Sequence, residues 1–71
     1  MAVKNNRKRL RGKIVSLLYG DCGYIVGDDG TIYLFFYRDV YHHQVPKVGM
    51  RVTFFPLYYT DPEAVEVKII S

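Results

Sequence analysis

The 71-residue sequence predicts a small all-β domain, either a barrel or a sandwich. Two observations support this fold class. β-Branched and aromatic residues, which suit pleated sheets, dominate after position 13. Turn signals rich in Gly, Pro and Asp separate short apolar runs, and no window has the period of a helix. Several short strands joined by tight turns are therefore expected.

Four of the five expected strands are simple to place. The first covers residues 10–18, with Ile14 toward the core, and the second covers residues 22–27 before the hairpin turn GDDG. The fourth, MRVTFF, is expected to stop at Pro56 because proline cannot donate a ladder hydrogen bond. The last, EAVEVKII, is expected to place Val65, Val67 and Ile69 on one face.

The remaining strand, TIYLFFY (31–37), is the most informative because both of its faces are apolar. We expect the face with Ile32, Leu34 and Phe36 to fill the core. The face with Thr31, Tyr33, Phe35 and Tyr37 carries three aromatic rings where a solvated sheet would carry charges. An exposed aromatic row is a candidate binding surface. Alternatively, these rings form a second packing layer under a loop.

The charge of the chain is unevenly distributed. Its net charge is +3, yet residues 1–11 contain five basic residues and no acid, whereas residues 12–71 contain five basic and seven acidic residues. This pattern predicts a basic, flexible tail over residues 1–9 and one domain over residues 10–71. Such a tail either contacts the phosphates of a polyanion or is only a solvated arm.

Several functional classes find no support in the sequence. The single cysteine, Cys22, cannot form an internal disulfide, which favours a reducing, cytoplasmic setting. No stretch approaches the roughly 18–20 apolar residues of a membrane span, and no signal-peptide core follows the basic N-terminus. The pairs His42-His43 and Asp28-Asp29 lack further metal ligands, and no catalytic constellation is evident. We expect a soluble protein that is not an enzyme and uses no cofactor or metal.

Six short motifs occur in order along the chain: GKI (12–14), GDCGYI (20–25), DDG (28–30), LFFY (34–37), VGMRVTF (48–54) and DPEAVEV (61–67). Together they resemble a cold-shock domain, the five-stranded antiparallel Greek-key barrel of the oligonucleotide-binding (OB) type. The resemblance covers residues 11 to about 70. In this family, aromatic side chains of two motifs stack on the bases of single-stranded RNA or DNA, and nearby cations hold the phosphates.

Carried over by position, the resemblance assigns base stacking to Tyr24, Phe35 and Tyr37 and a phosphate contact to Lys13. The sequence departs from the family pattern at Ser16, where the family has tryptophan. It also departs at Asp21 and Cys22, where the first ribonucleoprotein motif has lysine and phenylalanine. A shift of one residue in the third strand would place Leu34 and Phe36 on the binding surface instead, although the alternation favours Phe35 and Tyr37.

The resulting hypothesis is a monomeric binding module for single-stranded RNA or DNA, which acts as an RNA chaperone or expression regulator. The expected interface residues are Lys13, Tyr24, Tyr33, Phe35, Tyr37 and Arg38. The expected phosphate contacts of the tail are Lys4, Arg7, Lys8, Arg9 and Arg11. The alternative is a protein-interaction module on a barrel with a degraded nucleic-acid platform, associated with a ribosome or polymerase. Neither a membrane nor a small-molecule substrate is expected as a partner.

Overall fold

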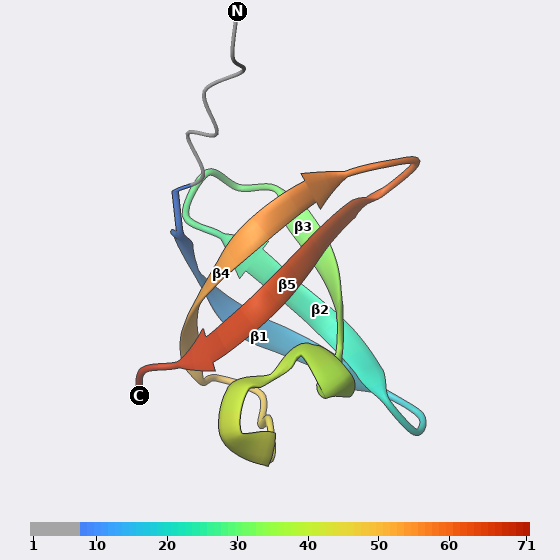
Figure 1. The fold of residues 1–71 in the computed structure, drawn as a ribbon, viewed down its shortest axis with the longest axis vertical. Helices are drawn as coiled ribbons and strands as arrows, with labels where there is room; N and C mark the ends of the chain where they lie inside the picture. The colour runs from blue at the N-terminus through green and yellow to red at the C-terminus, as the bar shows by residue number, and fades with distance from the viewer. Residues whose placement is uncertain (1–7) are drawn as a thin grey trace, which may run out of the picture.

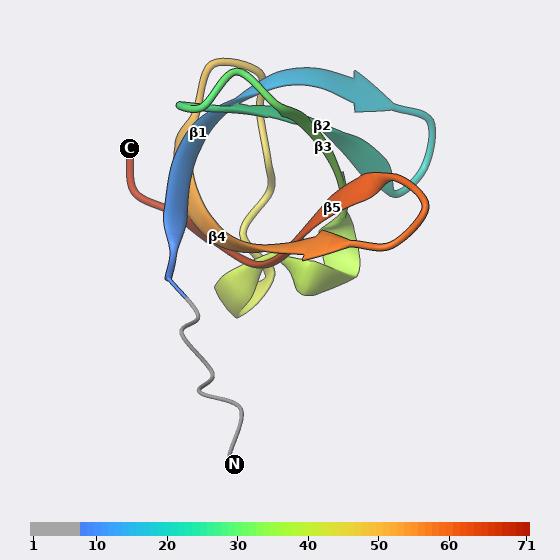
Figure 2. The ribbon, with the colours of Figure 1, turned by 90° about the horizontal axis from the view of Figure 1, so that it is seen from above.

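The five expected strands form and close into a barrel. The computed structural model describes residues 8–71. Its strands are β1 (Leu10–Leu18), β2 (Cys22–Gly27), β3 (Ile32–Phe36), β4 (Arg51–Tyr58) and β5 (Pro62–Ile69). Two short 3-10 helices, η1 (Tyr37–Asp39) and η2 (Tyr41–His43), follow β3. The strand order around the closed barrel is β1-β2-β3-β5-β4, and Figure 2 shows this ring from above.

Neighbouring strands are antiparallel except for β3 and β5, which run parallel where Leu34 pairs with Glu63 and Phe35 with Ala64. The chain makes this parallel contact after crossing from β3 through η1 and η2, which lie together at one end of the barrel (Figure 1). The prediction of an all-β, five-stranded barrel is therefore confirmed, with one parallel pair in place of a fully antiparallel arrangement.

Nine buried hydrophobic residues form the core of the barrel, and two of them come from the face of β3 that we expected to lie outside. Tyr33 and Phe35 are both 0% exposed, whereas Ile32 is 56% exposed. The expected orientation of β3 was therefore wrong. The ring of Tyr33 packs at 4.8 Å, centroid to centroid, from that of Phe54. The full set of core residues is Ile14, Ile25, Tyr33, Phe35, Val40, Val52, Phe54, Ala64 and Val67.

Two further expectations about β4 and β5 were wrong. Strand β4 continues through Pro56, which pairs with Ala64 of β5. Within residues 8–71, the pairing of β4 with β1 ends at Phe54, so Pro56 lies beyond this ladder, where the missing amide donor of proline is tolerated. The simple alternation of β5 is broken by a bulge at Glu66, whose φ is 50°. The bulge turns Val67 into the core, together with Ala64.

The turn between β2 and β3 fixes how these two strands pair. The Gly27 amide donates to the Thr31 carbonyl at 2.8 Å, and the Gly30 amide donates to the Gly27 carbonyl at 2.9 Å. Gly30 adopts a φ of 86°, a conformation that glycine reaches without a steric penalty. The turn brings Val26 opposite Ile32, and the rest of the hairpin register follows from that pair.

Candidate nucleic-acid interface

Strands β1, β2 and β3 present three rows of directly paired residues to the outside of the barrel. We call this surface the outer β1–β3 face. Directly paired residues of neighbouring strands project to the same side of a sheet, so each row forms a continuous strip. The rows are Lys13–Val26–Ile32, Ser16–Tyr24–Leu34 and Leu18–Cys22–Phe36. The aromatic residues of the outer β1–β3 face are therefore Tyr24 and Phe36.

Tyr33 and Phe35 cannot stack on bases because their rings are buried. The cause is the pairing of Phe35 with Gly23. A Cβ at Gly23 would lie 2.9 Å from the ring of Phe35, so the glycine makes the space that this ring occupies. Gly23 and Tyr24 are successive residues and point to opposite sides. An outward Tyr24 therefore requires an outward Leu34 and an inward Phe35. The length of the GDDG turn was the sequence signal for this register.

Phe36, which the predicted site did not include, is the second ring of the outer face. It is half-buried and pairs with Cys22. The guanidinium carbon of Arg38 lies 4.7 Å from its ring centroid, within the range of a cation–π contact. Arg38 is exposed, as expected of an interface cation, and the structure brings it to a ring that it was not predicted to contact.

Tyr37 lies at the start of η1, between the core and a surface cavity. Its ring stacks on that of Phe35, with centroids 6.1 Å apart and an interplanar angle of 16°. It also lines a cavity of about 340 Å³ with Arg38, His43, Gln44, Val45 and Pro46. A second cavity, of about 260 Å³, lies between the outer face and the β4–β5 turn and is lined by Tyr24, Ile32, Leu34, Asp61 and Pro62.

A hydrogen-bonded trio holds the β2–β3 turn against the end of β4. The Tyr33 hydroxyl donates to Asp29 Oδ2 at 3.0 Å and lies 3.0 Å from the Tyr58 hydroxyl. Burial raises the pKa of Tyr33, and its hydrogen bonds to Tyr58 and Asp29 add to this shift. The Thr31 amide donates to Asp29 Oδ1 at 2.9 Å and lowers the pKa of Asp29 below its ordinary value. Tyr33 thus stabilises the barrel and is not part of the outer β1–β3 face.

The predicted phosphate contacts lie on different parts of the molecule. Lys13 is exposed on the edge row of the outer face, next to Val26. Lys8 and Arg11 are exposed near the start of β1, and Lys4 and Arg7 lie outside the described residues.

Arg9 differs from the expectation of a free tail residue. Its Nε donates to Thr53 Oγ1 at 3.0 Å, and its Nη2 donates to the Glu66 carbonyl. Its guanidinium carbon lies 4.7 Å from the Phe55 ring centroid and 5.4 Å from that of Tyr41. Arg9 is therefore bound to the outside of β4 and β5.

Within residues 8–71, no three His, Cys, Asp or Glu side chains are grouped so that they could hold a metal ion. In the same range, no helix has the length and apolar character needed to cross a membrane.

Comparison with known proteins supports the fold. No protein-family model and no curated protein sequence matches this chain. Among solved structures, one described as "drosophila Unr CSD456" matches with a TM-score of 0.81 and 20% sequence identity. The match covers 93% of this chain but only 28% of that one, so this chain spans little more than a quarter of its structural neighbour. The chain has the fold of a cold-shock domain, an OB-type barrel.

Proposed function

We propose that this protein binds single-stranded RNA or DNA on the outer β1–β3 face. The observation that carries the proposal is the placement of Tyr24 and Phe36 on adjacent rows of this face, with Lys13 and Arg38 beside them. Base stacking on an aromatic side chain contributes about 1–3 kcal/mol and tolerates any base, because every base has a π face. The flanking cations hold the phosphates between the stacked bases.

The interface has fewer rings than the sequence predicts. Tyr24 and Phe36 supply two stacking positions, and Tyr37 supplies a third at the edge of the cavity beside Arg38. The other residues of the three rows are aliphatic, apart from Lys13, Ser16 and Cys22, so binding depends on a short run of bases. Sequence-tolerant holding of unpaired strands suits an RNA chaperone or an expression regulator, and this role needs no cofactor or bond-making chemistry.

The test is titration of a short, fluorescently labelled pyrimidine-rich oligonucleotide, followed by anisotropy. Removing either ring, by Tyr24→Ala or Phe36→Ala, is expected to weaken binding about 5- to 150-fold, the equivalent of one stacked base. Tyr59→Ala is the matched control because this tyrosine is 73% exposed at the β4–β5 turn, outside the three rows. Equal affinity of the wild type and both ring variants would refute the proposed interface.

A second function is favoured by the aliphatic character of the same face. Leu18 and Ile32, which lie in the rows on either side of the Tyr24 row, are 42% and 56% exposed, and exposed apolar side chains are typical of a protein-docking surface. On this alternative, the barrel binds a protein partner and the basic tail alone contacts nucleic acid. Single-strand binding that is insensitive to Tyr24→Ala and Phe36→Ala, yet lost when residues 1–8 are deleted, would favour it.

A further inference from the structure

The basic residues of the barrel strands lie on β1, β4 and β5 rather than on β2 and β3. Two rows of directly paired residues cross β1, β4 and β5 there: Arg11–Thr53–Lys68 and Lys13–Arg51. All four cations are exposed, whereas Gly12, Val52 and Val67, which lie next to them along the strands, are buried. We call the surface formed by Arg11, Lys13, Arg51 and Lys68 the basic face.

Like charges on this face are close enough to repel one another. Lys13 lies directly opposite Arg51, and directly opposite side chains have Cβ atoms about 4.5–5.5 Å apart. Lys68 is the diagonal neighbour of Arg51, at about 7–8 Å. Like charges in directly opposite positions destabilise a sheet. An anion that binds between them removes this repulsion, so the face is suited to a polyanionic partner.

Few acidic side chains offset these cations. Strands β1 (LRGKIVSLL) and β4 (RVTFFPLY) contain no Asp or Glu. Glu66 of β5 lies at the border of the face, where its Oε1 accepts a hydrogen bond from the Tyr41 hydroxyl at 3.2 Å. Arg9 adds a fifth positive charge beside Thr53, at a position fixed by its contacts with Thr53 and the Phe55 ring. These five cations outnumber the one carboxylate at the border, so the basic face carries a net positive charge.

The composition of the face favours phosphates over a lipid surface or an apolar peptide. Thr53, a polar residue, lies between Arg11 and Lys68, so the row that crosses all three strands contains no apolar side chain that could insert into a membrane. Lys13 also pairs with Val26, so the basic face is continuous with the outer β1–β3 face through this one residue. A nucleic acid that reaches one surface can therefore contact the other.

We propose that the basic face binds the phosphate backbone of nucleic acid without stacking on bases, and so accepts a base-paired duplex. This goes beyond the proposed function, which requires unpaired bases, and it does not rest on it. With both surfaces, the protein contacts a duplex or second strand through phosphates while the outer face holds unpaired bases. Such an arrangement places paired and unpaired segments on one small barrel.

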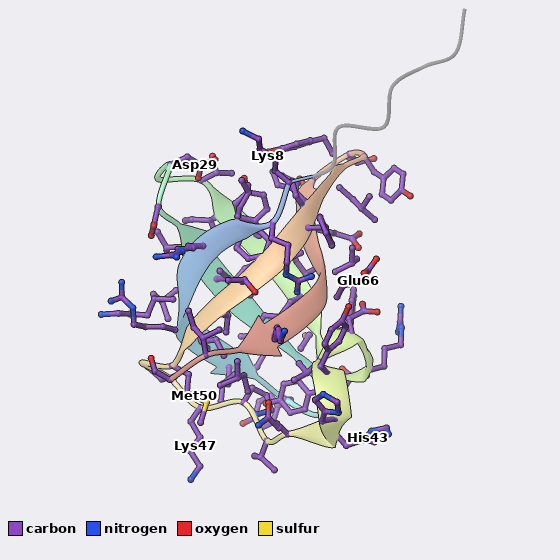
Figure 3. All side chains as sticks on the ribbon, turned by 60° about the vertical axis from the view of Figure 1, so that its left-hand side comes forward. Lys8, Asp29, His43, Lys47, Met50 and Glu66 are labelled. Atoms are coloured by element: carbon purple, nitrogen blue, oxygen red, sulfur yellow. The ribbon has the colours of Figure 1, made fainter. Side chains whose placement is uncertain are left out.

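The test uses the full chain and a labelled, blunt-ended DNA duplex, with affinity measured at several salt concentrations. The double variant Arg51→Gln/Lys68→Gln removes two charges from the basic face. If each contacts one phosphate, the slope of log affinity against log salt becomes shallower by about 1.8. Lys47→Glu is the matched control, because it makes the same change in net charge at a site that Figure 3 places at the end of the barrel opposite Lys8. Its slope is expected to stay near that of the wild type.

Three results would overturn the proposal. The first is a duplex slope of Arg51→Gln/Lys68→Gln equal to that of the wild type. The second is a slope for Lys47→Glu that is shallower by the same amount as that of the double variant, which would indicate an effect of net charge alone. The third is absence of duplex binding together with Arg51-dependent binding to vesicles containing an anionic phospholipid. Because Tyr24→Ala/Phe36→Ala removes rings and no cation, single-strand binding in that variant reports separately on the proposed function.

Discussion

Two adjacent phenylalanines of β3 are predicted to respond in opposite ways when each is replaced by leucine. Phe35 is fully buried between Gly23 and the ring of Tyr37, so Phe35→Leu leaves a small cavity in the core. We expect a loss of about 1–2 kcal/mol, less than the 3–5 kcal/mol of a full truncation to alanine. For a domain of this size, the thermal midpoint then falls by roughly 4–16 °C. The outer face is unaltered, so the folded variant keeps its oligonucleotide affinity.

Phe36→Leu produces the reverse pattern. The ring lies on the outer face under Arg38, and its removal loses a cation–π contact of about 0.5–1 kcal/mol. The thermal midpoint therefore changes little. The stacking surface is lost, however, and affinity for a short single strand falls about 5- to 150-fold.

Melting followed by circular dichroism and binding followed by anisotropy, at a temperature where both variants are folded, separate the two effects. A Phe35→Leu variant that melts like the wild type but binds weakly would refute the assigned orientation of β3. So would a Phe36→Leu variant that melts early and binds normally.

Three other predictions concern the frame of the barrel. Gly23→Ala should lower stability by about 1–3 kcal/mol in denaturant titration, because the new Cβ would lie 2.5 Å from the Ser16 carbonyl oxygen. Wild-type stability of this variant would contradict the close approach of β1 to Gly23. Arg9→Gln should destabilise the barrel by about 1–2 kcal/mol through loss of its contacts with Thr53 and two rings, whereas the exposed Arg11→Gln should stay within about 0.5 kcal/mol. The pKa of Tyr33 is raised, so the stabilisation by its neutral hydroxyl is present below the ordinary pKa of 10.0 and is lost as the pH rises above it. Melting curves of Tyr33→Phe should therefore lack the loss of stability that the wild type shows at alkaline pH. An identical loss in both proteins would contradict the raised pKa of Tyr33.

The extents of β1 and β2 could be predicted closely, because turn residues directly follow β1 and flank β2 on both sides. The orientation of β3 could not be predicted from alternation, since Ile32, Leu34 and Phe36 are as apolar as Tyr33 and Phe35. Alternation along a strand divides its residues into two faces, but it identifies the buried face only when the opposite face is polar. The deciding constraint was the hairpin register, which pairs the small Gly23 with the large Phe35.

Other features required contacts between distant segments. The bulge at Glu66 forms because one residue of β4 lies opposite two residues of β5. No local motif in EAVEVKII marks this bulge in the sequence. Arg9 lies in a run of basic residues that is typical of a solvated arm, yet its partners are 44 and 57 positions away in the sequence. The basic face is likewise invisible in the sequence, because its cations are scattered over three strands.

The central claim is that unpaired nucleic acid binds on the outer β1–β3 face. It is tested most directly by two-dimensional ¹H–¹⁵N NMR of the full chain, titrated with a short pyrimidine-rich oligonucleotide. The account predicts that the largest amide shifts occur in residues 22–26 and 34–38, around Tyr24, Phe36 and Arg38. Shifts confined to the first eleven residues or to β4 and β5, with the amides of β2 and β3 unchanged, would contradict it.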